Sequence, residues 1–144
     1  MNLCLDTCVL VDVLRGAKPH YQQRLEAEME AGAVLHLSPV VAHELELGVL
    51  LSARPDHHRR LVERLCSAMI RHDWTIDDAC EAAKVRAELK RSGERIEAPD
   101  VFLAGQARRR GWTLITANRK HFSRIAGLDF TDWAPPTAEK DHDG

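Results

Sequence analysis

The sequence predicts an α/β fold, a three-layer sandwich in which helices flank a central, mainly parallel sheet of four or five strands. Short apolar stretches of strand length alternate along the chain with longer stretches of helical periodicity. This alternation is typical of parallel sheets, because parallel strands need a long crossover connection that usually contains a helix. A length of 144 residues suits one domain, which we place at residues 1–133. A polar tail over residues 134–144 is expected to fray.

The first half of the chain is predicted to hold two strands, at residues 2–6 and 34–37, and four helices, at residues 8–14, 20–31, 39–52 and 57–68. The opening strand is a short apolar run that stops at Asp6. The helix over residues 39–52 has a clear start signal in Ser38 and Pro39. Serine caps helix N-termini, and proline suits the first helical position.

The second half is predicted to hold three strands, at residues 70–74, 113–116 and 128–130, and three helices, at residues 77–92, 99–110 and 120–125. Thr75 or Asp77 can cap the first of these helices, and Pro99 suits the start of the second. Gly93 and Gly111 follow their ends, where glycine is common. In such a fold, ligands bind beyond the carboxyl ends of the strands.

The composition excludes several classes of protein. At 44% hydrophobic and 29% charged residues, the chain has the makeup of an ordinary globular protein. It contains no run approaching the roughly 18 apolar residues that a membrane span requires. Asp6 and Asp12 lie close to the only apolar run near the N-terminus, and no basic segment precedes it. We therefore expect neither a signal peptide nor a membrane anchor, and a cytoplasmic location.

The four cysteines do not predict a metal site. Cys4, Cys8, Cys66 and Cys80 form no C-x-x-C pair, and structural zinc sites need such closely spaced pairs. A disulfide is not expected in the reducing cytoplasm. We expect Cys4 and Cys8 to be small buried hydrophobic residues.

Positive charge is concentrated in the middle of the chain. The net charge is −2 overall, but residues 54–124 carry sixteen Lys and Arg against ten acids. A polyanion bound across such a surface would be stabilised electrostatically. For any single cluster, such as residues 108–110, a solvated helix face is the simpler interpretation.

Three acids and one amide are candidates for a functional site. Asp6 ends a buried strand, and Glu44 lies on a helical stripe that we predict to be apolar through Val40, Val41, Leu47 and Leu51. A carboxylate on a buried face is costly unless it is paired or bound to a cation. Glu46 on the same helix is expected to point toward His43 and into solvent.

Asp100 and Asn118 are weaker candidates when taken singly. Asp100 falls in the first turn of a predicted helix, where an acid often only complements the helix dipole. Asn118 lies in the turn after the strand that ends at Thr116, and asparagine is common in turns. A parallel sheet would nevertheless bring these residues near Asp6 and Glu44. Clustered oxygen ligands of this kind favour Mg²⁺ or Mn²⁺ over zinc.

Five stretches follow one another in an order that is specific when taken together: LDTCVLVDVLRG, LSPVVAHELELG, GERIEAPDVFLAGQA, LITANRKHF and GLDFTDW. With them the chain resembles the PIN-domain ribonucleases of the VapC toxin type over nearly its whole length. The resemblance implies a PIN-like fold and a metal-dependent endoribonuclease, the toxin of a type II toxin–antitoxin pair. It also implies a homodimer and a VapB-type antitoxin whose C-terminal segment covers the site and inserts an arginine among the carboxylates.

The resemblance assigns roles to individual residues. Asp6, Glu44 and Asp100 would hold Mg²⁺ or Mn²⁺, while Thr116 and Asn118 would orient water or a phosphate oxygen. Thr7 and Asp12 are expected to support the site without touching the ion. Basic side chains from residues 84–124 would contact RNA, with Arg108, Arg109, Arg119, Lys120 and His121 as the named candidates.

Two departures from the family pattern affect the site. Asn118 stands where many PIN domains carry a fourth aspartate, and His121 occupies a nearby place that is sometimes acidic, so the number of metal ions, one or two, stays open. Cys8 stands where the family often has asparagine.

Two other functions stay open as well: a non-catalytic RNA-binding module of the same fold, and a DNA-directed nuclease of related architecture. A phosphotransfer domain built around Asp6 is disfavoured, because no lysine follows a late strand in the expected way.

Overall fold

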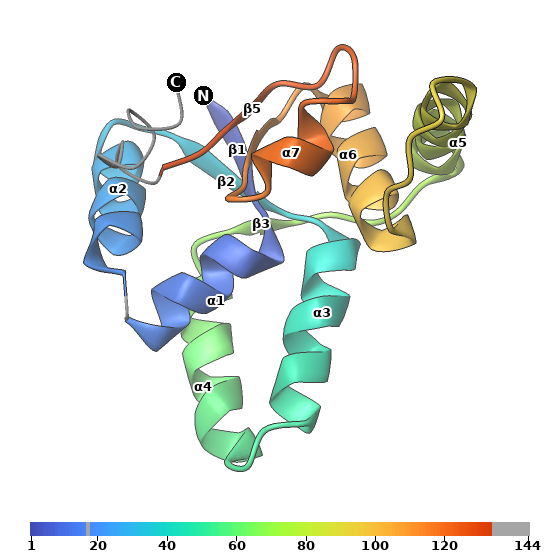
Figure 1. Cartoon of the computed structure of the whole chain (residues 1–144). Helices are drawn as coiled ribbons and strands as arrows, with labels where there is room; N and C mark the ends of the chain where they lie inside the picture. Colours follow the sequence, from blue (N-terminus) through green and yellow to red (C-terminus); the bar gives the residue numbers. More distant parts are fainter. Residues whose placement is uncertain (17, 134–144) are drawn as a thin grey trace, which may run out of the picture.

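The computed structural model describes residues 1–16 and 18–133, which fold around one five-stranded parallel sheet (Figure 1). The strands are β1 (Asn2–Leu5), β2 (Val34–Leu37), β3 (Ile70–Arg71), β4 (Thr113–Ile115) and β5 (Phe130–Thr131). Their order across the sheet is β3-β2-β1-β4-β5, and every neighbouring pair is parallel. The predicted α/β fold is therefore confirmed. The predicted tail at residues 134–144 lies outside the described residues.

Seven helices flank the sheet in the described part of the chain. They are α1 (Thr7–Arg15), α2 (Pro19–Glu30), α3 (Pro39–Leu50), α4 (Pro55–Cys66), α5 (Ile76–Arg91), α6 (Ala98–Arg110) and α7 (Arg119–Phe122). Figure 1 shows α3 and α4 extending from the sheet as an antiparallel pair, while α5 and α6 pack against each other elsewhere. None of the helices in residues 1–16 and 18–133 has the length and apolarity needed to span a bilayer.

Local chemistry explains most of the element boundaries. Ser38 caps α3 by accepting a hydrogen bond from the Val40 N–H. Thr75, one of the two predicted caps, forms a reciprocal capping box with Asp78 at the start of α5. Helix α2 begins one residue earlier than predicted and α4 two residues earlier, because each starts at a proline that suits the first helical position.

The outer strands are shorter than predicted. Strand β3 covers only Ile70–Arg71 of the expected 70–74, because it pairs with β2 at two positions and the chain then turns toward the Thr75 cap. Strand β5 lies slightly later than predicted, at Phe130–Thr131. Both are edge strands, and the Ile70 side chain is 50% exposed.

The central position of β1 creates the crevice in which a ligand can bind. Strand β1 is paired with β2 on one side and with β4 on the other, and Leu3, Cys4 and Leu5 are buried. From β1 the chain adds β2 and then β3 toward one edge of the sheet, whereas β4 and β5 lie toward the other edge. The connections that follow β1 and β4 therefore cover opposite faces of the sheet. Such a switch point opens a crevice at the carboxyl ends of the strands. Asp6 comes directly after β1, and Thr116 directly after β4.

Helices α5 and α6 are in unusually close contact. Gly105 of α6 lies against Ala82 of α5, and a Cβ atom at position 105 would be 2.5 Å from the Ala82 Cα. Because that obstacle is backbone, it cannot move without separating the helices. The contact fixes α6, whose first turn carries Asp100.

A buried ion pair reinforces this contact. Asp78 of α5 is fully buried and accepts a 2.8 Å hydrogen bond from Arg110 Nη2 and a 3.2 Å hydrogen bond from Arg109 Nη1. Burial alone would raise the pKa of Asp78, but the hydrogen bonds from Arg110 and Thr75 hold this pKa well below its usual value. The carboxylate is therefore ionised at neutral pH and joins the two helices.

We expect Gly105→Ala to destabilise the protein despite the higher helix propensity of alanine. Overpacking against backbone costs about 1–3 kcal/mol, which exceeds a propensity gain of about 1 kcal/mol. Gly48→Ala in α3 is the matched control, because the nearest atom to its Cβ is His58 Cε1 at 3.8 Å. Urea denaturation should give a lower free energy of unfolding for Gly105→Ala than for the parent, and an equal or higher one for Gly48→Ala. Equal stability of the two variants would contradict the close contact.

We expect Asp78→Asn to lower the free energy of unfolding at pH 7 by about 1.5–3 kcal/mol, because it removes the charge that binds the partly buried Arg110 guanidinium. The folded-state pKa of Asp78 is depressed, so the stabilisation is present above the unfolded pKa of about 3.9. It is lost as the pH falls below that value. Urea titrations should therefore show the parent and the variant converging below about pH 4. A constant difference at all pH values would contradict this role.

A candidate active site at the carboxyl end of the sheet

Asp6 is held in place through both of its carboxylate oxygens. It is the N-cap of α1, and its Oδ1 accepts a 2.8 Å hydrogen bond from the Thr7 N–H. Its Oδ2 accepts a 2.8 Å hydrogen bond from the Thr116 hydroxyl. The side chain is only 7% exposed, so the carboxylate is fixed at the end of β1 and faces the crevice.

Thr116 ties the ends of two strands together. Its buried hydroxyl donates to Asp6 and at the same time accepts a 2.9 Å hydrogen bond from the Asn118 N–H. The hydroxyl has one proton, which is used on Asp6. Thr116 therefore positions Asp6 and the turn at Asn118, and its hydroxyl proton is not free for a ligand.

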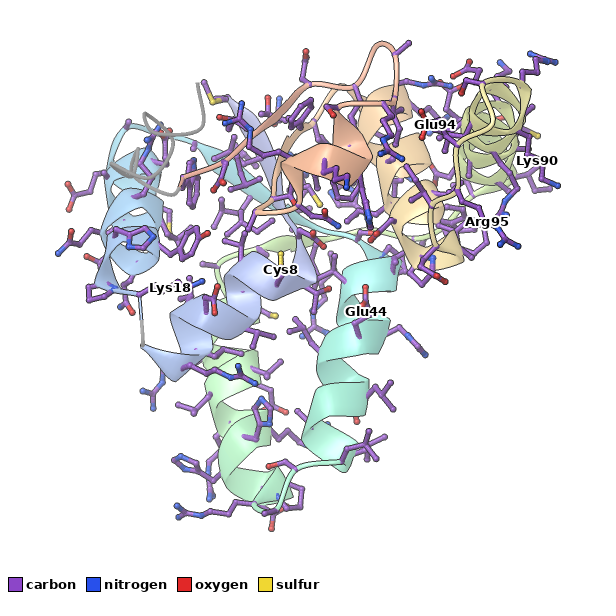
Figure 2. All side chains as sticks on the ribbon, viewed as in Figure 1. Cys8, Lys18, Glu44, Lys90, Glu94 and Arg95 are labelled. Carbon is purple, nitrogen blue, oxygen red and sulfur yellow. The ribbon has the colours of Figure 1, made fainter. Side chains whose placement is uncertain are left out.

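Glu44 reaches the same region from α3. The Thr7 hydroxyl donates a 3.2 Å hydrogen bond to Glu44 Oε1, so Thr7 links Asp6 to Glu44 as a supporting residue. Burial raises the pKa of Glu44, and the negative charges of Asp6 and Asp100 raise this pKa further. Figure 2 shows Glu44 on α3, beside the start of α1, where Cys8 is labelled.

The buried stripe of α3 differs from the predicted one. Val41, Leu45 and Val49 are buried, whereas Leu47 and Leu51 are largely exposed. The predicted apolar face was therefore wrong for its second half. Glu44 lies beside the true stripe and is half-buried, which lets its carboxylate reach the crevice.

Asp100 approaches from the first turn of α6. Burial raises its pKa, and the charge of Asp6 adds to this effect. His121 Nδ1 lies 3.5 Å from Asp100 Oδ2 and 2.7 Å from Asn118 Nδ2. When the ring proton is on Nε2, the Nδ1 atom can accept the Asn118 amide N–H.

The predicted carboxylates therefore converge from three separate segments. Asp6 follows β1, Glu44 lies on α3 and Asp100 lies in the first turn of α6. They are nevertheless close enough that the charges of Asp6 and Asp100 raise the pKa of Glu44, and the charge of Asp6 raises the pKa of Asp100. Within residues 1–16 and 18–133, no three His, Cys, Asp or Glu side chains form a ready-made metal-ligand set. The donors nevertheless fit Mg²⁺ chemically, since this ion is usually bound by one or two carboxylates together with waters and phosphate oxygens.

Other residues named from the sequence have different surroundings. Asp12 pairs with Lys18 at 3.2 Å. Cys4 is buried as predicted, but Cys8 is exposed and its Sγ lies 3.4 Å from Asp6 Oδ2, so the expectation of a buried Cys8 was wrong. No disulfide forms among the four cysteines, all of which lie in the described residues. Although part of the Cys8 side chain is exposed, partial desolvation raises the pKa of its thiol to about 11, and the Asp6 charge contributes to the increase.

The predicted RNA-contacting residues divide into two groups. Arg108 is 12% exposed and pairs with Glu81 and Glu88 of α5, and Arg109 pairs with Asp77 and Asp78. The structure thus uses both arginines to join α5 and α6. Arg119 and Lys120, in contrast, are exposed on the short helix α7 near Asn118.

Glu46 also differs from its prediction. It does not point freely into solvent but forms a two-pronged ion pair with Arg59 of α4, with both N–O distances at 2.7 Å. The hydrogen bonds from Arg59 lower the pKa of Glu46. Two glutamates two residues apart on α3 therefore have opposite environments.

Comparison with known proteins places the chain in a family. The PIN-domain model matches residues 3–128, and the chain therefore belongs to the PIN-domain family, as the sequence resemblance predicted. Among curated proteins it is 27% identical to a tRNA(fMet)-specific endonuclease VapC of Shigella flexneri, over 93% of this chain and 99% of the relative. It is 26% identical to ribonuclease VapC2 of Haemophilus influenzae, over 92% and 98% of the two chains.

Solved structures agree with this placement. The fold matches the VapBC2 structure of Rickettsia felis, bound to a DNA fragment from its promoter, with a TM-score of 0.87 at 25% identity over 93% of this chain and 100% of that one. It matches the DNA-bound VapBC structure of Salmonella typhimurium with a TM-score of 0.85 at 27% identity, over 93% and 99% of the chains. The PIN-like architecture is therefore shown by both sequence and structure.

We expect Glu44→Gln to raise the melting temperature of the metal-free protein by about 2–4 °C. A raised folded-state pKa means that the ionised form destabilises the fold above the unfolded pKa, and the neutral amide removes that repulsion. Glu46→Gln is the matched control on the same helix and should lower the melting temperature, because the ion pair with Arg59 is lost. Thermal denaturation in chelator at pH 7 tests both. Shifts of the same sign would contradict the assignment.

Proposed function

We propose that this protein is a metal-dependent endoribonuclease that acts as the toxin of a type II toxin–antitoxin pair. The observation that carries the proposal is the convergence of Asp6, Glu44 and Asp100 at the switch point of a PIN-domain sheet. Relatives that align with nearly the whole chain are named as ribonucleases or endonucleases, which supports the same activity.

Asp6, Glu44 and Asp100 are the residues that would hold Mg²⁺ or Mn²⁺. When bound, such an ion lowers the pKa of a coordinated water and offsets the charge that develops on the phosphate. The protein prepares the ligands: the Thr7 N–H and the Thr116 hydroxyl fix the two oxygens of Asp6, and the Thr7 hydroxyl orients Glu44. Holding these carboxylates together before the cation arrives avoids reorganisation during the reaction.

Asn118 and His121 are placed to act on the substrate side of the carboxylates. Both are partly exposed and contact each other, and His121 also contacts Asp100. One N–H of the Asn118 amide faces His121 Nδ1, and the other can donate to a phosphate oxygen or a water. Thr116 acts indirectly by positioning Asp6, because its hydroxyl proton is donated to the Asp6 carboxylate.

The partner of this toxin would be a VapB-type antitoxin. Several of the similar structures are VapBC complexes, which supports an antitoxin partner. We propose that a C-terminal segment of this partner covers the carboxylate site. We further propose a homodimer and a cytoplasmic location. The specific RNA and the cleaved bond depend on the substrate surface around the site.

We expect the purified protein to cleave structured RNA in Mg²⁺ or Mn²⁺, and to lose at least about 100-fold in rate as Asp6→Asn or Asp100→Asn, because each change removes a ligand of the catalytic ion. Gel analysis of RNA fragments, with added metal or with chelator, measures the effect. Asp56→Asn is the matched control, since Asp56 is an exposed acid in the first turn of α4.

The same assay separates the competing functions. Cleavage that survives chelation and both site substitutions would overturn the metal mechanism. RNA binding without cleavage by the parent protein would indicate a non-catalytic RNA-binding module. Preferred cleavage of single- or double-stranded DNA in parallel reactions would indicate a DNA-directed nuclease instead.

A further inference from the structure

A cavity of about 590 Å³ adjoins the carboxylate site at the start of α6. It is lined by Arg86, Arg95, Ile96, Glu97, Ala98 and His121. His121 also contacts Asp100, at 3.5 Å. The cavity and the carboxylates therefore share a wall, and a ligand that extends away from the carboxylates past His121 would enter the cavity.

The two arginines of this cavity are available for a ligand. Across the described ranges 1–16 and 18–133, Arg86 and Arg95 form no side-chain hydrogen bond or ion pair, whereas Arg108, Arg109, Arg110 and Arg124 are all paired with acids. Arg86 is half-buried and Arg95 is exposed. A partly buried guanidinium without an acid partner favours binding of an anion.

The start of α6 adds to the positive character of the cavity. Glu97 and Ala98, the cap and first residue of this thirteen-residue helix, line the cavity. The Glu97 side chain forms no capping hydrogen bond, so the N–H groups of the first turn are uncapped by this residue, while Asp100 in the same turn offsets part of the helix dipole. Glu97 is the one acid in the lining and is exposed, which places its charge in solvent.

A second cavity continues the same surface. It has a volume of about 230 Å³ and shares Arg86, Arg95 and Ile96 with the first, and it adds Lys90 and Glu94. Glu94 is paired with Arg124, so its charge is neutralised, while Lys90 is exposed. Figure 2 shows Lys90, Glu94 and Arg95 together on the side of the molecule formed by α5 and α6.

We infer that Arg86 and Arg95 form a subsite for a backbone phosphate of the RNA, next to the phosphate that is cleaved. The inference rests on the proposed function, which puts the scissile phosphate at the carboxylates. Guanidinium groups match phosphate oxygens with paired hydrogen bonds, and successive cations along two joined cavities suit the regular charges of a nucleic-acid backbone. The subsite replaces Arg108 and Arg109 as the principal RNA contact.

The test is RNA binding by an Arg86→Gln/Arg95→Gln variant, measured by fluorescence anisotropy with a short labelled single-stranded RNA. Chelator is present, so the result does not depend on cleavage. We expect the affinity to fall about tenfold or more and the salt dependence to become shallower by about 0.7 per lost phosphate contact. Arg60→Gln/Arg64→Gln is the matched control, because it removes two exposed positive charges on α4 and should leave affinity unchanged.

Two further binding measurements identify the group that the arginines bind. An Arg86→Lys/Arg95→Lys variant keeps both charges and should retain part of the affinity and all of the thermal stability. RNAs with a single neutral methylphosphonate linkage, scanned along the strand, should bind more weakly to the parent at one linkage beside the cleaved bond. That penalty should vanish in the glutamine variant.

Two results would overturn the subsite: RNA affinity of the glutamine variant equal to that of the parent, or a methylphosphonate penalty that persists in it at every linkage. An acidic protein partner as the true occupant would give the first of these results. Failure of the proposed function gives a different result, in which the parent binds RNA through the two arginines in chelator but leaves it uncut when Mg²⁺ is added.

Discussion

The pairing of β1 with β4 is the constraint on which the site depends. The Asp6 N–H donates to the Ile115 carbonyl at 2.8 Å, which extends the β1–β4 ladder one residue beyond the strand. The Thr116 hydroxyl then joins the Asp6 carboxylate from the neighbouring strand. Backbone and side chain thus hold the same residue, and every other group of the site is positioned relative to it. A slip of one residue in this register would turn Asp6 to the opposite face of the sheet.

A cluster of carboxylates works against folding, and the remainder of the structure offsets that cost. The raised pKa values of Glu44 and Asp100 show that their ionised forms are disfavoured where they lie. Asp100 cannot move away, because its helix is locked to α5 by the Gly105 contact and by the buried Asp78. The same repulsion that destabilises the metal-free fold favours a bound cation, so rigidity in α5 and α6 serves the chemistry.

The sequence predicted the parts of this structure that depend on local or periodic signals. The parallel α/β order, the Ser38 and Thr75 caps and the convergence of Asp6, Glu44 and Asp100 followed from element type and position. Contacts between distant side chains did not, because spacing does not reveal which acid an arginine meets. Arg108 and Arg109 were named as candidate RNA contacts for this reason, although they pair with acids of α5. The α3 stripe was misjudged because the helices that pack on α3, which are α1, α4 and α6, decide which face is covered.

The division of charge on α5 explains where a polyanion can bind. Asp78 lies in the buried stripe of α5, Glu81 and Glu88 lie on one side of that stripe, and all three neutralise the arginines at the end of α6. Arg86 and Lys90, one helical turn apart, lie on the other side. The many positive charges of residues 54–124 are therefore not equivalent. Some form ion pairs that join α5 to α6, and others line cavities. Arg86 and Arg95, which have no acid partner among the described residues, line the cavity beside the carboxylates, so their positive potential lies where a phosphate backbone would approach.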